Sequence, residues 1–247
     1  MIITLTTDIG WEYAAEMKGK IYSINPDAKI VDVSHEVKPG CIAEGAFIIY
    51  SISPYFKNAI HVGVVDPGVG TDRRAIIIEC SNCYFVGPDN GLFIPAAKRM
   101  GIKNIYEIRI NASVSSVFHG RDVFAPAAAR LARGEEVSKI GQKIDEYVDF
   151  DFGLPLREEN KIKGKILFID RFGNIITNIK SVDEDKFLVK IGKIEREVKL
   201  YPSYGYARIG EVIAVESSSG FLEIAINQGN AGRYFNAREG ETIEIFL

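Results

Sequence analysis

A glycine-rich loop in the first third of the chain carries an acid and two bases. Residues 64–75 read Val-Val-Asp-Pro-Gly-Val-Gly-Thr-Asp-Arg-Arg-Ala. The apolar run 60–65 predicts a strand that is buried on both faces and ends at Asp66. Arg73 and Arg74 follow within the loop, at the kind of strand end where ligands of open α/β sheets collect. The stretch therefore suits acid–base chemistry, although a turn with a surface ion pair explains it equally well by itself.

Two more polar residues stand where expected strands or helices meet loops. Asp8 follows the apolar residues 2–6, and its carboxylate could either cap the helix expected over residues 12–24 or accept hydrogen bonds from a diol such as ribose. His119 precedes an alanine-rich helix and adjoins a glycine. A histidine in such a place can accept a proton near neutral pH, whereas most lone histidines are structural. Both readings stay open for each residue at this point.

A second candidate binding segment lies in the last third of the chain. Residues 168–179 read Phe-Ile-Asp-Arg-Phe-Gly-Asn-Ile-Ile-Thr-Asn-Ile. Asp170, Phe172 and Asn174 interrupt what would otherwise be an apolar strand. An aromatic ring next to an amide can stack on a flat base and hydrogen-bond its edge. A bulged hairpin with Asn in its turn accounts for the same letters.

The order of the expected elements predicts the fold class. In the first half, apolar strands alternate with helices, which is typical of an α/β domain with a mainly parallel sheet and flanking helices. In the last third, short strands with alternating apolar residues follow one another with turns between them, which predicts an antiparallel β-barrel or a small sandwich. We therefore divide the chain into an α/β domain (1–150), an acidic linker without periodicity (151–163) and a β-barrel domain (164–247).

The composition narrows the class of protein. Of the 247 residues, 47% are hydrophobic and 26% are charged, as in globular domains. The formal net charge of -3 predicts no binding to nucleic acid or to an anionic membrane surface. No apolar segment approaches the roughly 20 residues that span a bilayer, and the N-terminus reaches a carboxylate by residue 8, unlike a signal peptide. We expect no membrane association.

The three cysteines favour a reducing, cytoplasmic location. Three is too few, and too odd a number, for a secreted disulfide framework. Cys80 and Cys83 form a Cys-x-x-Cys pair, but they flank a turn between two expected strands instead of a helix N-terminus, and no second pair completes a zinc site. We interpret them as two small residues beside a hairpin.

Taken together, seven segments resemble the family of S-adenosyl-L-methionine hydroxide adenosyltransferases, which are related to the fluorinating and chlorinating enzymes that act on the same substrate. The resemblance covers essentially the whole chain. The segments that carry it are Thr7-Asp8-Ile9-Gly10, Met17-Lys18-Gly19, Val65-Asp66-Pro67-Gly68-Val69-Gly70-Thr71, Gly87-Pro88-Asp89-Asn90-Gly91-Leu92, Phe118-His119-Gly120-Arg121-Asp122, Phe172-Gly173-Asn174 with Thr177-Asn178, and Asn227-Gln228-Gly229-Asn230-Ala231. Each segment is weak alone, whereas seven in the family's order are specific.

The resemblance implies the architecture and the catalytic group. It implies an N-terminal α/β domain, a C-terminal β-barrel domain, and a homotrimer whose substrate lies between the N-terminal domain of one subunit and the C-terminal domain of its neighbour. S-adenosyl-L-methionine is then the substrate and no cofactor is needed. The acid, arginine and histidine that surround the attacking water in the family fall on Asp66, Arg73 and His119.

The resemblance also implies substrate contacts. The matching residues are Asp8 for the ribose, Phe172 and Asn174 for the adenine, and Asp170 and Ser218 for the methionine amino group. One position departs from the fluorinating enzymes, which have an arginine near the methionine carboxylate where this chain has Ser219. The resemblance therefore assigns no residue to the carboxylate.

The chemistry of this substrate suits these residue types. The sulfonium leaves as a neutral thioether and needs no acid, so catalysis must activate water for in-line attack on the ribose C5′. Asp66 and His119 can orient that water and accept its proton, and Arg73 can stabilise the developing hydroxide. An ionised Asp66 would repel a halide, which favours water as the nucleophile. Three alternatives remain: a non-catalytic S-adenosylmethionine sensor, a halide-dependent adenosyl transferase, and a structural trimer without ligand.

Overall fold

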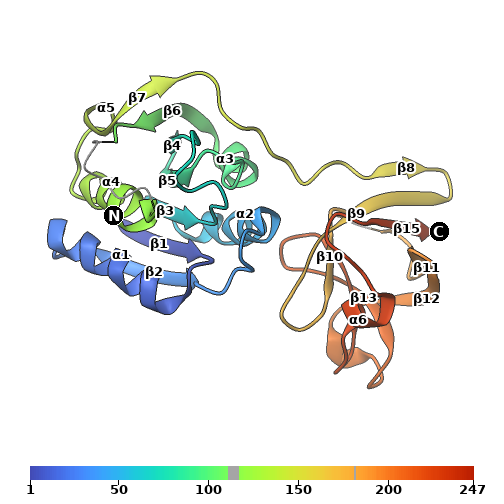
Figure 1. The fold of residues 1–247 in the computed structure, drawn as a ribbon. Helices are drawn as coiled ribbons and strands as arrows, with labels where there is room; N and C mark the ends of the chain where they lie inside the picture. Colours follow the sequence, from blue (N-terminus) through green and yellow to red (C-terminus); the bar gives the residue numbers. More distant parts are fainter. Residues whose placement is uncertain (111–116, 181) are drawn as a thin grey trace. The chain divides into compact units, whose positions relative to one another are not determined.

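The computed structural model describes residues 1–110, 117–180 and 182–247, which form two compact units (Figure 1). The first unit is Met1–Asp151 and the second is Phe152–Leu247. The range 151–163, expected to be a linker, contains strand β8 (Leu156–Glu158) and the start of strand β9 (Lys161–Ile169). The side chains of these strands that face outward are polar, so the sequence of this range is acidic and shows no apolar period. Strand β8 and the start of β9 were therefore not predicted.

A seven-stranded sheet forms the centre of the first unit, in the order β2-β1-β3-β5-β4-β6-β7. The strands β2, β1, β3 and β5 run parallel to one another, whereas β4 pairs antiparallel with β5 and β6, and β6 pairs antiparallel with β7. Their bounds are β1 Ile2–Thr7, β2 Lys29–Ser34, β3 Ala59–Val64, β4 Ala75–Cys80, β5 Cys83–Pro88, β6 Ile102–Ile108 and β7 Gly141–Ile144. Every residue of β3 is buried, including His61, as predicted from residues 60–65.

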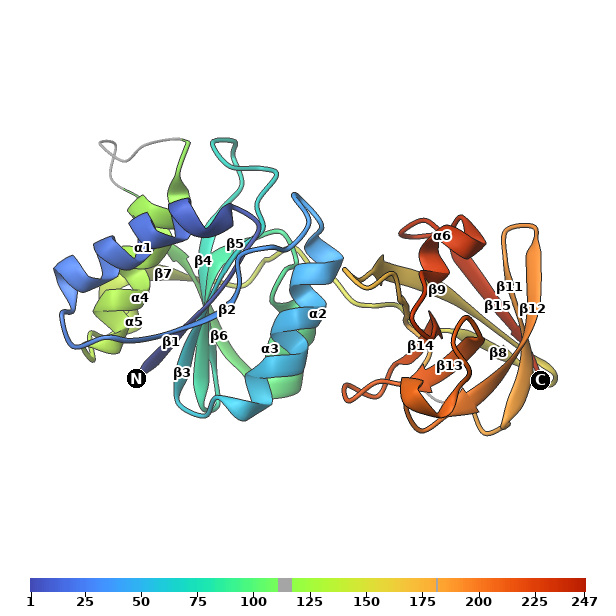
Figure 2. The same cartoon turned by 90° about the horizontal axis from the view of Figure 1, so that it is seen from below.

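Helices cover both faces of this sheet, with α1, α4 and α5 on one face and α2 and α3 on the other (Figure 2). Their bounds are α1 Gly10–Ile24, α2 Ile42–Ile52, α3 Ile94–Met100, α4 Ala125–Ala132 and α5 Val137–Ile140, and short helical turns η1 (Ser53–Tyr55) and η2 (Gly120–Phe124) adjoin α2 and α4. Helix α1 buries Ala14, Met17 and Ile21, one stripe with helical spacing. This arrangement confirms the predicted α/β domain with flanking helices.

The start of α1 differs from one of the two expectations for Asp8. The residue at the helix N-cap is Ile9, and no side chain caps the helix. The Asp8 carboxylate turns elsewhere and accepts a hydrogen bond from the backbone N–H of Gly40 at 2.8 Å. The capping alternative is therefore wrong, and the carboxylate belongs to the loops at the end of the sheet.

The second unit is a β-barrel, as predicted. Its strands follow the order β10-β14-β13-β12-β11-β15-β9, and pairing of β9 with β10 closes the ring, while β8 adds to β9 outside it. The remaining bounds are β10 Ile175–Thr177, β11 Lys186–Ile191, β12 Ile194–Tyr201, β13 Val212–Glu216, β14 Leu222–Ile226 and β15 Thr242–Phe246. One pair, β12 with β13, is parallel and the others are antiparallel. The barrel encloses a core rich in isoleucine and valine.

Two short helical segments of this unit had no counterpart in the predictions. Helix α6 (Ala231–Phe235) replaces part of an expected turn, and its N-cap Asn230 accepts a hydrogen bond from the Arg233 N–H at 2.7 Å. A 3₁₀ turn, η3 (Tyr204–Tyr206), lies in the connection between β12 and β13. Of the two segments, η3 contributes a residue, Tyr204, to the pocket described below.

No helix in the described residues is long and apolar enough to cross a bilayer. Cys80 and Cys83 end and begin the antiparallel strands β4 and β5, with Ser81 and Asn82 between them, as expected of a hairpin. Both cysteines are buried and neither forms a disulfide.

Candidate functional site

Two carboxylates lie at the same edge of the first unit's sheet. Strands β1 and β3 are parallel neighbours with Thr7 opposite Val64, so the residues that follow them leave the sheet side by side. The Asp8 N–H donates to the Val64 carbonyl at 3.1 Å, and Asp66 comes directly after this strand end. This is the edge of an α/β sheet at which ligands bind. The structure thus brings Asp8 and Asp66 together.

Arg73 joins Asp66 to His119. The Arg73 Nε donates to Asp66 Oδ1 at 3.0 Å, and its Nη2 pairs with Asp66 Oδ2, so the guanidinium grips both carboxylate oxygens. The same Nη2 contacts His119 Nδ1 at 3.2 Å. The side chains of Arg73 and Asp66 are only 7% and 5% exposed, and the guanidinium lies 5.4 Å from the centre of the Phe124 ring. The three residues proposed for catalysis therefore form one contiguous, largely buried group.

The contact with Arg73 determines the tautomer of His119. A guanidinium nitrogen can only donate, so His119 Nδ1 must accept and the proton of the neutral ring sits on Nε2. Burial lowers the pKa of His119, the charge of Arg73 lowers it further, and the carboxylates of Asp66 and Asp122 oppose this shift. At neutral pH the ring is thus a neutral donor through Nε2.

The loop between Asp66 and Arg73 is shaped by one glycine in particular. Gly70 has a φ of +79°, in the left-handed region that glycine adopts at little cost. Gly68 lies beneath Arg73, but an added Cβ there would meet Arg73 at ordinary van der Waals distance. The conformation of Gly70 therefore turns the chain so that Arg73 returns to Asp66.

The neighbouring Arg74 serves a different carboxylate. Its guanidinium pairs with the buried Asp89 at 2.8 Å, and the other oxygen of Asp89 accepts from the Val148 N–H at 2.9 Å. Arg74 and Asp89 thus fasten the loop to the segment that precedes the second unit. The two adjacent arginines have separate partners.

Asp8 sits in an environment that disfavours its charge. Burial raises its pKa, the hydrogen bond from Gly40 opposes this, and the nearby charge of Asp66 adds to the rise. A polar group that donates hydrogen bonds to Asp8 would offset the cost of keeping it ionised. A ribose diol is such a group.

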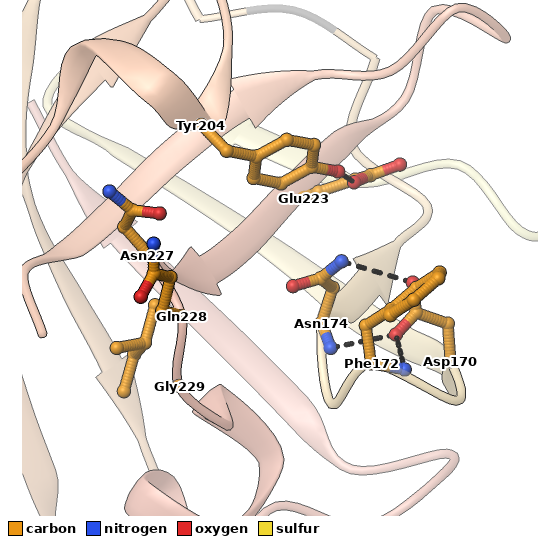
Figure 3. Close-up of a pocket in the computed structure, with 9 residues that line it drawn as sticks. Asp170, Phe172, Asn174, Tyr204, Glu223, Asn227, Gln228 and Gly229 are labelled. Carbon is orange, nitrogen blue, oxygen red and sulfur yellow. Dashed lines mark hydrogen bonds between the residues drawn. The ribbon is translucent and has the colours of Figure 1, made fainter. Parts of the chain in front are cut away.

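The second unit contains a pocket of about 430 Å³ (Figure 3). Three of its lining residues, Asp170, Phe172 and Asn174, are residues that the sequence predicted for binding. The other lining residues are Tyr204, Glu223, Ile226, Asn227, Gln228 and Gly229. The predicted binding segment is therefore part of a concave site. A bulged hairpin, the alternative interpretation, would not need to line a pocket.

A network around Asp170 orients Asn174. Asp170 Oδ1 accepts from the backbone N–H groups of Phe172 and Asn174 at 2.8 and 2.9 Å, and its Oδ2 accepts from Asn174 Nδ2 at 3.0 Å. Because the amide nitrogen faces Asp170, the amide oxygen of Asn174 points away from it, as Figure 3 shows. Phe172 is 64% exposed, and the Arg171 guanidinium lies 4.9 Å from the centre of its ring. The pocket thus presents an acceptor and an aromatic surface.

Ser218 is not brought to this pocket. It is exposed in the turn between β13 and β14 and is absent from the lining residues. Conversely, Tyr204 and Glu223 line the pocket but were not predicted. The one sequence signal for Glu223 was a carboxylate in the middle of the otherwise apolar residues 221–226. No sequence feature marked Tyr204 as a pocket residue, because only the folded barrel brings it beside Glu223.

Comparisons with known proteins agree with these observations. Residues 3–141 match the model of the SAM hydroxide adenosyltransferase N-terminal domain, and residues 164–244 match that of the C-terminal domain. The (R)-S-adenosyl-L-methionine hydrolase of Methanocaldococcus jannaschii is 41% identical over 99% of this chain and 95% of its own, and that of Salinispora tropica is 33% identical over 98% and 97%.

A solved structure has the same fold throughout. The crystal structure of an uncharacterized conserved protein from Thermotoga maritima superposes with a TM-score of 0.91 at 36% identity and covers 100% of both chains. The two domain models together span most of the chain, and two relatives exceed 30% identity over nearly all of it. This chain belongs to the family of SAM hydroxide adenosyltransferases.

Proposed function

We propose that this protein is an enzyme that hydrolyses S-adenosyl-L-methionine to adenosine and L-methionine. The observation that carries this proposal is the buried group of Asp66, Arg73 and His119, in which an acid, a cation and a neutral imidazole contact one another at a sheet edge suited to ligands. Family membership and the names of the relatives support the same reaction.

In the proposed reaction, Asp66 accepts the proton of the attacking water. His119 Nδ1 is occupied by Arg73 and its Nε2 carries a proton, so this ring can orient the water by donating to its oxygen but is poorly placed to act as the base. Each oxygen of Asp66 retains a lone pair beyond its bond to Arg73. Asp66 is therefore the better acceptor, and Arg73 stabilises the developing negative charge.

The bond changes then balance without any cofactor. The water oxygen forms a bond to C5′ as the bond from C5′ to sulfur breaks, and the electron pair of that bond passes to sulfur. The sulfonium becomes the neutral thioether of methionine. Attack of a developing hydroxide on a cation neutralises charge, and exclusion of bulk water strengthens this attraction.

We assign recognition of the adenosyl group to the second unit's pocket and to Asp8. The Asn174 oxygen can accept from the exocyclic amino group of adenine, and the exposed face of Phe172 can stack on the base. We assign the methionine ammonium to Asp170, which lines the pocket, and the ribose hydroxyls to Asp8. Ser218 remains a candidate for the ammonium on the basis of the resemblance alone.

The assembly that we propose is a homotrimer with sites at subunit interfaces. The water-activating group and the base-binding pocket belong to different units of the chain. Light scattering should give a trimer, and a monomer would contradict this part of the proposal. In addition, a mixture of Asp66→Asn and Asn174→Ala chains, unfolded and refolded together, should show turnover with the wild-type KM. Neither variant has this alone, and in the mixture some interfaces combine two intact halves.

The direct test is incubation with S-adenosyl-L-methionine followed by chromatography. The proposal predicts adenosine and methionine in equal amounts, in buffers with and without chloride or fluoride. Formation of a 5′-halo-adenosine without adenosine would identify a halogenating enzyme instead. Binding without turnover over hours would identify a sensor.

A further inference from the structure

Glu223 is an acid in a strand that is otherwise apolar. It lies in β14 between the buried Leu222 and Ile224, is itself only 8% exposed, and lines the second unit's pocket. Burial of a carboxylate is costly unless hydrogen bonds or an opposite charge compensate it. The strand would be more stable with an apolar residue at this position. We therefore look for a role of the carboxylate in the pocket that it lines.

The protein supplies only a partial compensation. The Tyr204 hydroxyl donates to Glu223 Oε2, as the dashed line between them in Figure 3 shows. Burial raises the pKa of the Glu223 carboxyl, the Tyr204 hydrogen bond opposes this, and the charge of Asp170 adds to the rise. Among the described lining residues there are two acids, Asp170 and Glu223, and no lysine or arginine. The two lining acids therefore favour a ligand with positive charge, although the Arg171 guanidinium lies against the Phe172 ring, 4.9 Å from its centre.

We propose that Glu223 is a specificity-determining residue that makes this pocket prefer adenosyl compounds that carry an additional positive charge. The inference rests on the proposed function, because S-adenosylmethionine differs from S-adenosylhomocysteine by its sulfonium charge. Glu223, in β14, adds a second negative charge to that of Asp170, which lies in the turn between β9 and β10. Discrimination by charge would favour the sulfonium substrate over the neutral thioether, which has a similar shape.

Tyr204 has a separate role in this account. It comes from η3, outside the barrel strands, and its hydroxyl ties that turn to β14. The ring then forms one wall of the pocket (Figure 3). Loss of the hydroxyl should loosen the wall for every adenosyl ligand, whereas loss of the Glu223 charge should affect the cationic ligands alone.

The test is a calorimetric measurement of the affinities of two ligands. Neither ligand contains a sulfonium, so the proposed reaction cannot consume it. Sinefungin carries an ammonium group at the sulfur position, and S-adenosylhomocysteine carries a neutral sulfur. We expect the full-length wild-type chain to prefer sinefungin, and Glu223→Gln to reduce the ratio of the two affinities on the order of tenfold, since the change removes one nearby charge but keeps the shape and an acceptor for Tyr204.

Three variants sharpen the result. Glu223→Asp keeps the charge and should keep most of the preference, and Tyr204→Phe should weaken both ligands alike. Glu197→Gln, which removes an exposed carboxylate on β12 away from the lining residues, should change neither affinity. An unchanged ratio in a folded Glu223→Gln protein would overturn the inference, as would equal loss of both ligands at an unchanged Tm.

These outcomes are independent of the proposed reaction. Failure of the wild-type chain to release adenosine would refute the proposed function while leaving the affinity ratio measurable. Turnover of S-adenosylmethionine together with an unchanged ratio in Glu223→Gln would refute the role of Glu223 alone.

Discussion

The two candidate regions of this protein satisfy their charged groups in opposite ways. In the first unit, Asp66, Arg73 and His119 are partners of one another, so the group is assembled before any ligand arrives. In the second unit, Asp170 is held by its own turn, while Glu223 has a neutral hydroxyl as partner and faces an open pocket. The first arrangement suits chemistry, which needs fixed geometry, and the second suits recognition, which needs a ligand to complete it. Substitutions in the two regions should therefore affect different kinetic constants.

The largest effect is expected from Asp66→Asn, which keeps the shape of the side chain but removes the proton acceptor. We expect kcat to fall about 10³-fold, within the range typical of a lost general base, with little change in KM. The matched control is Asp72→Asn, a change in the same loop at a residue outside the group. Steady-state kinetics that left the turnover of Asp66→Asn near that of wild type would remove Asp66 from the mechanism.

The next largest effect is expected from Arg73→Lys. A lysine cannot grip both oxygens of Asp66 and contact His119 at once, so we expect kcat to fall about 10²-fold although the charge is kept. Arg74→Lys is the control, because that arginine pairs with Asp89 instead. Equal losses in the two variants would mean that the loop needs positive charge in general, and would contradict the specific role of Arg73.

A smaller effect with the opposite kinetic signature is expected from Asn174→Ala. This change removes the acceptor that faces the pocket and the donor to Asp170, so KM should rise roughly tenfold while kcat stays within a few-fold of wild type. If kcat fell and KM did not change, the division between chemistry in one unit and recognition in the other would be wrong.

The smallest expected effect is the pH dependence of kcat. Burial and the Arg73 charge lower the pKa of His119 below the ordinary value of 6.5, so the neutral form persists to more acidic pH than in a free histidine. We therefore expect kcat to stay level as the pH falls from 8 to 6.5, and to fall only below that, when protonation places a second cation beside Arg73. A profile of kcat against pH checks this. In His119→Asn, the fall of kcat at acidic pH should be absent. A decline that began above pH 6.5 would contradict the assignment.

Much of the first unit could be predicted because its signals are local. The apolar run before Asp66 predicted β3, and Asp66 and Arg73 are close enough in sequence for one tight loop to join them. His119 is distant along the chain, so its place beside Arg73 followed from the resemblance and from the structure, not from spacing. For Asp8, local signals allowed both a cap and a ligand contact, and the backbone of Gly40 decided against the cap.

The second unit was harder to read because a barrel depends on distant pairings. Alternating apolar residues predicted most of its strands but not their neighbours, and β10 is too short to show a period. Tyr204 and Glu223 meet only because the connection after β12 folds back over β14. Ser218 was assigned from the resemblance, and the structure leaves it exposed in a turn outside the pocket.

The central claim is that water, activated by the first unit, attacks C5′ of the substrate. The most direct measurement is turnover of S-adenosyl-L-methionine in water enriched in heavy oxygen, with mass spectrometry of both products. The account predicts that adenosine carries one heavy oxygen, at its 5′ position, and that methionine carries none. Adenosine without the label, or no adenosine at all, would contradict it.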